Sequence, residues 1–240
     1  MKARLDQLLV DRGLAESRTK AQALILAGEV MINGQKAAKA GQTVDVESRI
    51  EVLAPPRFVS RGGAKLEAAL KHFAIPVQDR ICLDIGSSTG GFTDCLLQQG
   101  ARKVYAFDVG TNQLDWKLRN DPRVVLREQV NARYLTAADV PELIDLAVCD
   151  VSFISITMIL PVLPSLLTPV GEMVILVKPQ FEVERAQVGK GGIVRDPALH
   201  QAACLRVERA VQALGYRTSL MPSPLPGAEG NLEFLLYARH

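Results

Sequence analysis

The chain has 240 residues, of which 48% are hydrophobic, so it can bury one large core and a small additional module. It contains no apolar run of the roughly 18 residues that cross a bilayer, and its first residues lead into Asp6 and Asp11 rather than into an apolar signal core. We therefore expect a cytoplasmic protein that is neither exported nor inserted in a membrane.

The net charge of +2 is unevenly distributed along the chain. Residues 1–65 contain 11 Lys or Arg and 7 Asp or Glu, whereas residues 66–240 contain 17 and 19. A basic first part predicts a module that binds a polyanion, followed by a different second part. The four cysteines lie far apart in apolar surroundings without metal-ligand spacing, so we expect reduced core residues and no metal site.

Two short helices are expected first. Leu5, Leu8 and Leu9 recur at helical spacing before Gly13, and a second helix can begin after Ser17 and end at Gly28. An Asn-Gly pair at 33–34 then predicts a hairpin, and the alternation over 45–52 predicts one half-exposed strand.

The order of these residues, R-L-D-x-x-L followed by S-R-x-x-A-x-x-L-I-x-x-G-x-V-x-I-N-G, resembles the RNA-binding domain shared with small-subunit ribosomal protein four. The resemblance implies that Arg4, Arg18 and Lys20 belong to a basic surface that contacts RNA phosphates rather than reading bases. The alternative is that these charges only form the solvated faces of two helices.

Residues 1–54 are therefore expected to form a small α+β RNA-binding domain, and residues 55–60, with two prolines, to form a linker. Residues 61–240 are expected to form the second domain, which opens with a helix. Lys65 is expected in the first turn of this helix, where a cation opposes the helix dipole. That position suggests a functional role, although a lysine that extends into solvent is the alternative.

A glycine-rich segment at 83–93 links a buried strand to the next helix, as a cofactor-binding loop does. Its spacing, D-x-G-x-x-x-G-G, differs from the dinucleotide motif G-x-G-x-x-G and resembles the first motif of S-adenosylmethionine-dependent methyltransferases. An ordinary strand-to-helix turn is the alternative. The residues expected at this cofactor are Asp84, Gly86, Ser87, Ser88, Gly90, Gly91 and Phe92.

The remaining chain alternates strands and helices, with strands expected at 103–108, 124–128, 144–150 and 173–177. This alternation predicts an α/β fold, a parallel Rossmann-like sheet with helices on both faces, as in class I methyltransferases. Ligands bind at the carboxyl ends of such strands.

Several polar residues follow these strands. Asp108 is expected to accept hydrogen bonds from a ribose diol, which suits a nucleoside-containing cofactor. Gln129 and Asn131 are expected at an adenine edge, although they could also be turn formers. Asp150 ends its strand at the same edge of the sheet, so it is also expected beside the cofactor.

The segment 149–155 lacks the N/D-P-P-Y pattern that clamps a planar amine, and Cys149 lies inside a strand, where it cannot serve as an accessible thiolate. Lys65, Asp150, Lys178 and Glu233 match, in order and setting, the catalytic tetrad of FtsJ-like ribose 2′-O-methyltransferases. Glu182 is an alternative to Glu233, because it follows Lys178 by only four residues.

Together with these residues, the motifs S-R-G-G-x-K-L, D-I-G-S-S-T-G-G-F-T-D, C-D-V-S-F-I-S, V-K-P-Q-F-E and G-x-x-G-N-x-E resemble the TlyA family, also known as hemolysin A-type proteins. The resemblance implies methyl transfer from S-adenosylmethionine to a cytidine 2′-OH, with rRNA or a ribosomal subunit as partner and no metal. The alternatives are a non-catalytic RNA-binding assembly factor and a haemolysin, and no spanning segment supports the latter.

A ribose hydroxyl is a poor nucleophile, so the site must help to remove its proton. We expect the amine of Lys178 to accept it, because desolvation and a neighbouring cation both favour a neutral amine. Asp150 would orient Lys178, and Glu233 would position the pair. The resemblance implies that Lys65 lies nearby, either as the neighbouring cation or as a hydrogen-bond partner of the ribose. The glycine-rich stretch 180–197 is expected to be either a mobile lid or a surface insertion.

Overall fold

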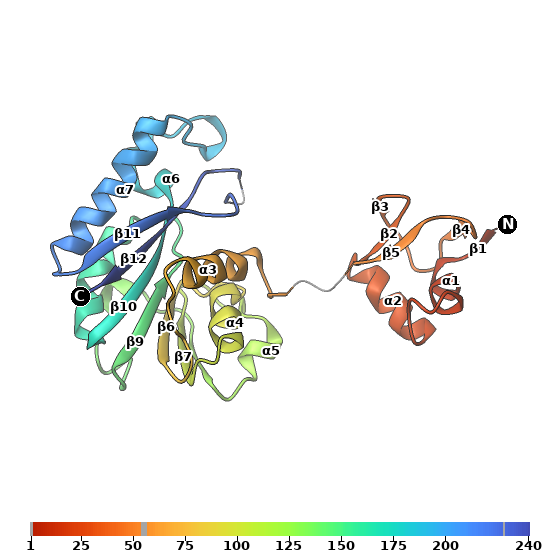
Figure 1. Ribbon diagram of the computed structural model, residues 1–240, viewed down its shortest axis with the longest axis horizontal. Coiled ribbons are helices and arrows are strands. Elements are labelled where there is room, and N and C mark those ends of the chain that lie inside the picture. Colours follow the sequence, from red (N-terminus) through yellow and green to blue (C-terminus); the bar gives the residue numbers. More distant parts are fainter. Residues whose placement is uncertain (1, 54–56, 228) are drawn as a thin grey trace. The chain divides into compact units, whose positions relative to one another are not determined.

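The computed structural model describes residues 2–53, 57–227 and 229–240. The chain forms two compact units, Met1–Arg57 and Phe58–His240, called unit 1 and unit 2 below (Figure 1). Residues 55 and 56 of the expected linker lie outside the described residues. Phe58 already belongs to unit 2, where its ring is buried against Gly63 at the start of the first helix.

Unit 1 consists of two helices and two small antiparallel sheets. The helices are α1 (Leu5–Asp11) and α2 (Arg18–Leu26). One sheet pairs β1 (Lys2–Arg4) with β4 (Thr43–Asp45), and the other has the order β3-β2-β5, with β2 (Val30–Ile32), β3 (Gln35–Lys36) and β5 (Ile50–Val52). Buried side chains from both helices and both sheets form one core. The two helices and the hairpin are confirmed.

The single strand expected over 45–52 is wrong. The structure has two short strands there, β4 and β5, which belong to different sheets. Between them, the Asp45 carboxylate accepts a hydrogen bond from the backbone N–H of Glu47, and the Asn33 side chain accepts one from that of Arg49. Such side-chain bonds compete with the strand ladder and favour a turn.

Unit 2 contains one seven-stranded sheet in the order β11-β12-β10-β9-β6-β7-β8. The five strands from β10 to β8 are parallel, and β12 is antiparallel to both of its neighbours. The strands are β6 (Ile81–Ile85), β7 (Lys103–Phe107), β8 (Val124–Arg127), β9 (Ile144–Cys149), β10 (Leu167–Val177), β11 (Arg217–Pro222) and β12 (Phe234–Arg239). The strand order reverses between β6 and β9, where ligands bind in such sheets.

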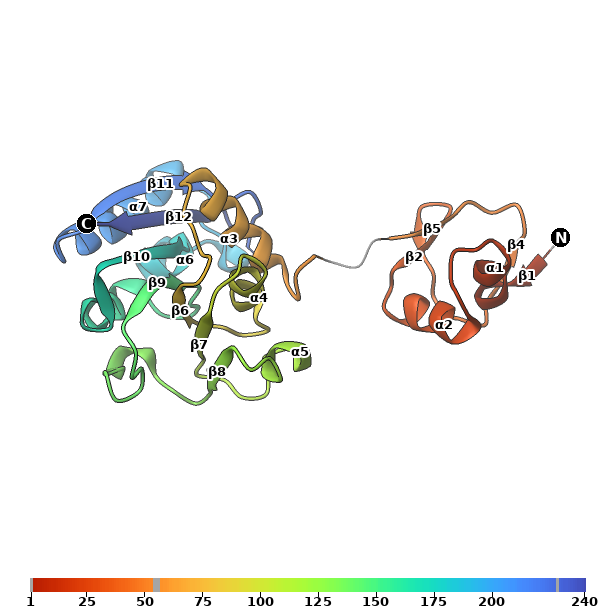
Figure 2. The same ribbon diagram turned by 60° about the horizontal axis from the view of Figure 1, so that its bottom comes forward.

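Helices cover both faces of this sheet, as expected (Figure 2). On one face lie α3 (Arg61–His72), α4 (Gly91–Gln98) and α5 (Trp116–Arg119), which share a buried apolar cluster with alternate residues of the strands. On the other face lies α7 (Pro197–Gln212), which packs in a second cluster. The predicted α/β fold is confirmed.

The connections from β8 to β9 and from β9 to β10 contain shorter helices than expected. Only 3-10 helices connect β8 to β9 and β9 to β10, namely η1 (Ala132–Tyr134), η2 (Ile156–Met158) and η3 (Leu160–Ser165). Prolines 161 and 164 lie within η3, and a proline inside a helix cannot donate the backbone hydrogen bond that a longer α-helix needs.

The stretch 180–197 contains α6 (Pro179–Glu182), η4 (Arg185–Gln187) and η5 (Lys190–Gly192). Its end is packed, because Asn231 accepts a hydrogen bond from the N–H of Val194 at 2.9 Å and donates one to the carbonyl of Gly192 at 2.9 Å. Val194 is itself buried. This packing favours the surface insertion over the lid for this end of the stretch.

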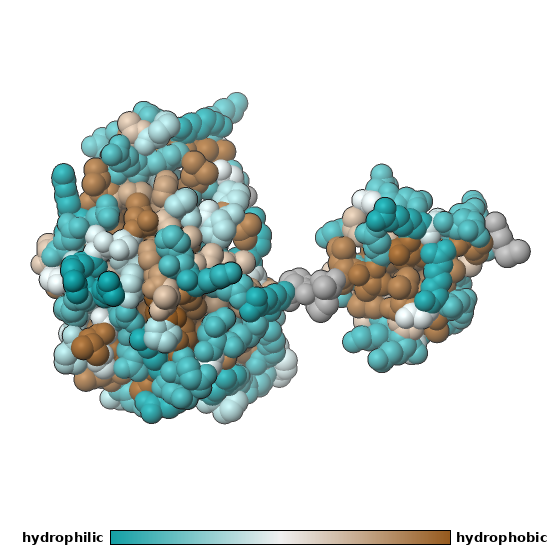
Figure 3. Space-filling view, in the orientation of Figure 1, coloured by the Kyte–Doolittle hydropathy of each residue, from teal (hydrophilic) through white to brown (hydrophobic). Residues whose placement is uncertain are grey.

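The surface of unit 2 is mainly hydrophilic on the face shown in Figure 3, with smaller apolar areas between the polar side chains. Three aromatic side chains of unit 2 are largely exposed, Phe153 at 93%, Trp116 at 74% and Tyr134 at 71%. Within the described ranges, no helix is long and apolar enough to cross a membrane.

Candidate active site

Gly86 and Gly90 lie in the loop between β6 and α4, and contacts within the protein require glycine at both positions. Gly86 has a φ of 84°, and a Cβ there would lie 2.3 Å from the carbonyl oxygen of Asp150. Gly90 has a φ of 97°, and its Cβ would lie 2.3 Å from a methyl group of Leu118. The expected tight turn is confirmed, because both glycines have left-handed backbone and no room for a side chain. Gly86 also lines two cavities beside this loop, whereas Gly90 lines neither.

A cavity of about 740 Å³ opens at the carboxyl ends of β6, β7 and β9, and is called cavity A below. This volume lies within the range that small-molecule sites usually have. Its apolar lining includes Ile85, Phe107, Val130, Phe153, Met158 and Ile159, and its polar lining Ser88, Asp108, Gln113, Asn131, Asp150, Ser152 and Ser155.

Asp108 is the carboxylate best placed for a sugar in cavity A. It accepts hydrogen bonds from the N–H groups of Ser88 at 2.8 Å and Gly110 at 2.7 Å, which fix its orientation. A carboxylate has about four acceptor positions, so it retains room for a diol. Asn131 also lines the cavity, and its side chain accepts a hydrogen bond from the N–H of Arg133 at the start of η1. Gln129 is exposed and lies outside the lining of this cavity.

A second cavity, of about 340 Å³, adjoins the first and shares Gly86, Ser88 and Asp150 with it. It is called cavity B below. Its lining comprises Ser60, Arg61, Gly62, Lys65, Gly86, Ser87, Ser88, Thr89, Gly91, Phe92, Asp150, Lys178 and Glu233. Ser87, Gly91 and Phe92, which we expected at the cofactor, therefore lie here rather than in cavity A. All four residues of the expected tetrad also meet in cavity B.

Two ion pairs organise cavity B. Lys65 pairs with Glu233, and both side chains are nearly buried, at 9% and 3% exposed. Lys178 Nζ lies 2.5 Å from Asp150 Oδ1 and donates a hydrogen bond to Ser152 Oγ at 2.9 Å. Lys65 lies in the second turn of α3, not in the first as expected, and its pairing with Glu233 explains why it does not extend into solvent.

Glu182, the alternative to Glu233, lies elsewhere. Its carboxylate accepts hydrogen bonds from Ser155 Oγ at 2.6 Å and from the N–H of Ile156 at 2.8 Å. Burial raises the pKa of Glu182, although these two hydrogen bonds oppose the shift. Glu182 lines neither cavity, so the geometry favours Glu233 as the tetrad member.

Asp84 lies beneath the glycine-rich loop and lines neither cavity. It is fully buried and accepts a hydrogen bond from Thr93 Oγ1 at 2.6 Å. Burial raises the pKa of Asp84 to about 7, although the bond from Thr93 opposes the shift. Asp84 Oδ1 and the nearby Ser87 Oγ are both buried without a hydrogen-bond partner in the described part of the chain. Of the residues expected at the cofactor, Asp84 thus lies beneath the loop and Gly90 within it, and neither lines a cavity.

The cysteines match the sequence interpretation. All four are buried free thiols. Burial raises the pKa of Cys149 far above its usual range, and the neighbouring carboxylates of Asp84 and Asp150 add to the shift. A thiol in this setting is a poor source of thiolate, so a covalent base adduct through Cys149 does not suit this site.

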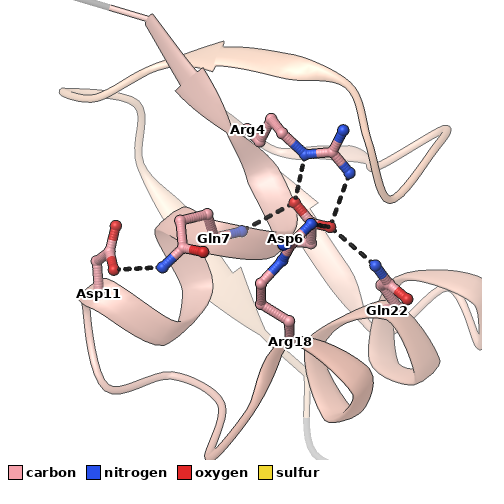
Figure 4. A network of polar contacts seen from close by, with 6 residues as sticks. All are labelled: Arg4, Asp6, Gln7, Asp11, Arg18 and Gln22. Atoms are coloured by element: carbon pink, nitrogen blue, oxygen red, sulfur yellow. Dashed lines mark hydrogen bonds and ion pairs between the residues drawn. The ribbon is translucent and has the colours of Figure 1, made fainter.

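In unit 1, Arg4 and Arg18 converge on a single buried carboxylate, that of Asp6 (Figure 4). Gln22 of α2 donates to the same carboxylate at 2.9 Å. The hydrogen bonds from Arg4 and Gln22 hold the pKa of Asp6 well below its usual range. Arg18 and Gln22 thus join α2 to α1, whereas Arg4 belongs to β1. The two arginine side chains remain 54% and 51% exposed, so they still present N–H groups to solvent. Lys20 is also exposed.

Comparison with known families identifies the family of unit 2 and the domain in unit 1. Residues 58–240 match the FtsJ-like methyltransferase family. The chain belongs to this family. Residues 3–50 match the S4 domain.

Relatives and solved structures support this assignment over the whole chain. The chain is 48% identical to the 16S/23S rRNA (cytidine-2′-O)-methyltransferase TlyA of Mycobacterium tuberculosis, over 99% of this chain and 90% of that protein. It is 46% identical to Hemolysin A of Brachyspira hyodysenteriae, over 98% of each. A solved structure described as "Putative hemolysin from Streptococcus thermophilus" is 46% identical, covers 99% of this chain and 88% of that chain, and has a TM-score of 0.75.

In this member of the FtsJ-like family, sequence reasoning missed three residues near the ion pairs: Ser60, Arg61 and Ser152. Ser60 and Arg61 line cavity B from the start of α3, and Ser152 is the hydrogen-bond partner of Lys178. The sequence does carry a signal for Ser152, because it follows Asp150 by two residues in the segment C-D-V-S-F-I-S.

Proposed function

We propose that this protein transfers a methyl group from S-adenosylmethionine to the 2′-OH of a cytidine in rRNA. The observation that carries the proposal is the meeting of two lysine–carboxylate pairs, Lys65 with Glu233 and Lys178 with Asp150, beside a cavity of cofactor size. The name of the Mycobacterium tuberculosis relative supports the same reaction and the same nucleotide.

The residues around the two cavities fit S-adenosylmethionine, which supplies an electrophilic methyl group when bound. Asp108 offers carboxylate oxygens to a ribose diol in cavity A, and Asn131 offers an amide nearby. Phe107, Val130 and Ile159 provide apolar contacts for a base. Ser87 lines the adjoining cavity B, and its buried hydroxyl has no hydrogen-bond partner among the described residues.

Lys178 is the proposed proton acceptor. Its side chain is 11% exposed and follows the buried end of β10, so it is largely shielded from water. As a neutral amine it can accept the proton of the 2′-OH while the oxygen attacks the methyl group. Asp150 then stabilises the ammonium that forms. Holding the alcohol and the methyl group in line supplies a further share of the acceleration, roughly 7–11 kcal/mol in model systems.

Lys65 has a different proposed role. Its ammonium is held by Glu233 in a buried pair, so it remains a fixed cation and hydrogen-bond donor at the wall of cavity B. In that position it can donate to an oxygen of the target ribose. The roles of the two lysines thus differ because their partners differ: Glu233 is buried with Lys65, whereas Asp150, the partner of Lys178, is 24% exposed and lines both cavities.

Unit 1 is proposed to bind rRNA or a ribosomal subunit through Arg4, Arg18 and Lys20. The half-exposed guanidinium groups of Arg4 and Arg18 have N–H donors left for phosphate oxygens. Binding through phosphates supplies affinity without sequence selection, so unit 2 must choose the nucleotide.

The experiment that tests the function is mapping of 2′-O-methylated riboses in rRNA after incubation with S-adenosylmethionine and the purified protein. We expect new 2′-O-methylcytidine with the wild-type protein and none with Lys178→Ala. Protein-free rRNA and isolated ribosomal subunits should be assayed in parallel, because both are possible substrates. RNA binding without any methylation on either substrate would instead identify a non-catalytic assembly factor.

A further inference from the structure

The loop that follows β9, residues 151–155, contacts the proposed proton acceptor and lies outside the tetrad. Lys178 Nζ donates a hydrogen bond to Ser152 Oγ at 2.9 Å. Asp150 Oδ1 lies closer, at 2.5 Å, but has no partner in hydrogen-bond geometry among the described residues. Asp150 therefore attracts the charge of Lys178, whereas Ser152 makes the directional contact with the amine.

We propose that Ser152 is a positioning residue that aims the lone pair of Lys178 at the target 2′-OH, and that Glu182 holds the loop carrying Ser152 in place. The inference rests on the proposed function, because it concerns the same proton transfer. A neutral lysine amine has two N–H donors and one lone pair. When one N–H points to Ser152 and the other lies toward Asp150, the lone pair occupies the one remaining tetrahedral direction.

Without Ser152 the amine would lose its directional contact. The ion pair with Asp150 would survive, since it depends on distance and charge, but the amine could rotate about the Cε–Nζ bond and turn its lone pair away from the 2′-OH. A base must lie within hydrogen-bond reach of the proton that it removes, and small errors of position are costly in rate. Ser152 should therefore affect the chemical step more than the binding of either ligand.

Glu182 explains how Ser152 is held at this distance. It belongs to α6, which begins directly after Lys178, and its carboxylate accepts hydrogen bonds from Ser155 and Ile156 at the end of the loop. Next to Ser152, Phe153 has a φ of 67° and its ring lies 5.5 Å from that of Phe181 in α6.

A positive φ is costly for a bulky residue and persists only where the surroundings enforce it. The C-terminal end of the loop is thus fastened to α6, which follows Lys178 directly. This arrangement gives the buried carboxylate of Glu182, which lines neither cavity, a function in the same reaction.

The test is single-turnover methylation of the rRNA substrate by Ser152→Ala, with steady-state kinetics for both ligands. We expect kcat to fall by about 10- to 100-fold while the KM values for S-adenosylmethionine and RNA stay within about twofold of wild type. Ser152→Thr keeps the hydroxyl and should restore most of the rate. Ser165→Ala is the matched control, because Ser165 is an exposed serine whose hydroxyl donates only to the carbonyl of Val162.

Glu182 is tested by two substitutions. Glu182→Gln keeps an acceptor for the N–H of Ile156 and can donate to Ser155, so it should retain near-normal kcat. Glu182→Ala should lower kcat to the level of Ser152→Ala, and the double variant with Ser152→Ala should lose little more, because both act on the direction of Lys178. Melting temperatures of all variants identify any loss that comes from unfolding.

A Ser152→Ala enzyme with kcat within about twofold of wild type would overturn this inference while leaving the proposed function intact. So would a variant whose only defect is a raised KM for S-adenosylmethionine, since Ser152 would then be a ligand contact. A wild-type protein that methylates neither rRNA nor ribosomal subunits would instead contradict the proposed function, and this inference with it.

Discussion

Lys65 of α3 and Glu233, which precedes β12, form a buried ion pair although 168 residues separate them in the sequence. The pair joins the first helix of unit 2 to its last strand at the wall of cavity B. Gly227 lies against it, because a Cβ at this position would come within 2.6 Å of a Glu233 carboxylate oxygen. The ion pair therefore links the two ends of unit 2, and loss of the pair should lower both the stability of unit 2 and the activity.

Replacement of Glu233 by alanine should destabilise unit 2 by roughly 3–5 kcal/mol, because it leaves the Lys65 ammonium buried without a partner. Chemical denaturation of the variant measures this loss. Glu229→Gln is the control, since Glu229 is exposed on the same turn. A Glu233→Ala protein as stable as this control would show that Lys65 can reach solvent.

Gly86→Val should abolish binding of S-adenosylmethionine. The valine Cβ would collide with the carbonyl oxygen of Asp150, and a φ of 84° is strained for a β-branched residue. Isothermal titration calorimetry measures the affinity, and unit 1 should still fold. Gly191→Ala is the control for positive φ alone, because its Cβ would meet no atom within 4 Å. Undiminished affinity in Gly86→Val would contradict the role given to this loop.

Joint replacement of Arg4, Arg18 and Lys20 by alanine should weaken RNA binding and flatten its salt dependence. The structure refines the experiment, because losing either arginine removes a partner of the buried Asp6 carboxylate and should also lower the stability of unit 1. Lys20→Ala alone isolates the phosphate contact and should reduce the salt slope by about one. The affinity of the triple variant for S-adenosylmethionine should not change. An unchanged RNA affinity and an unchanged salt slope would show that RNA binds elsewhere.

Asp84 should make the stability of unit 2 depend on pH. Its folded pKa of about 7 lies above the unfolded value of 3.8, so the folded protein holds this proton more tightly. The contribution of this proton to the unfolding free energy is complete below about pH 4. It decreases as the pH rises toward 7 and is lost above pH 7. The difference in unfolding free energy between wild type and Asp84→Asn, measured from pH 5 to 8, should change accordingly. A difference that stays constant over this range would mean that Asp84 is ionised in the folded protein.

The glycine-rich loop and the positions of the strands along the chain could be predicted because both are local patterns: β6 and α4 follow each other in the sequence, and each strand has its own apolar run. The tetrad could be predicted only through a family resemblance. No local pattern relates Lys65 to Glu233, because their pairing depends on β12 inserting antiparallel beside β10.

Other features escaped the sequence for similar reasons. The break between β4 and β5 depends on hydrogen bonds of Asp45 and Asn33, which outweigh the alternating pattern of 45–52. The need for glycine at 86 comes from the backbone of Asp150, which is 64 residues away. Ser152 follows Asp150 by only two residues, but its hydrogen bond with Lys178 joins positions 26 residues apart, which no local pattern relates.

The central claim is that Lys178 removes the proton of the 2′-OH, and single-turnover methylation by Lys178→Arg tests it most directly. A guanidinium does not deprotonate in proteins, so this variant keeps a cation beside Asp150 but cannot act as a base. We predict that it binds S-adenosylmethionine and RNA normally and transfers no methyl group, whereas the wild-type protein methylates under the same conditions. Near-normal single-turnover methylation by Lys178→Arg would contradict the claim and leave alignment of the two ligands as the source of catalysis.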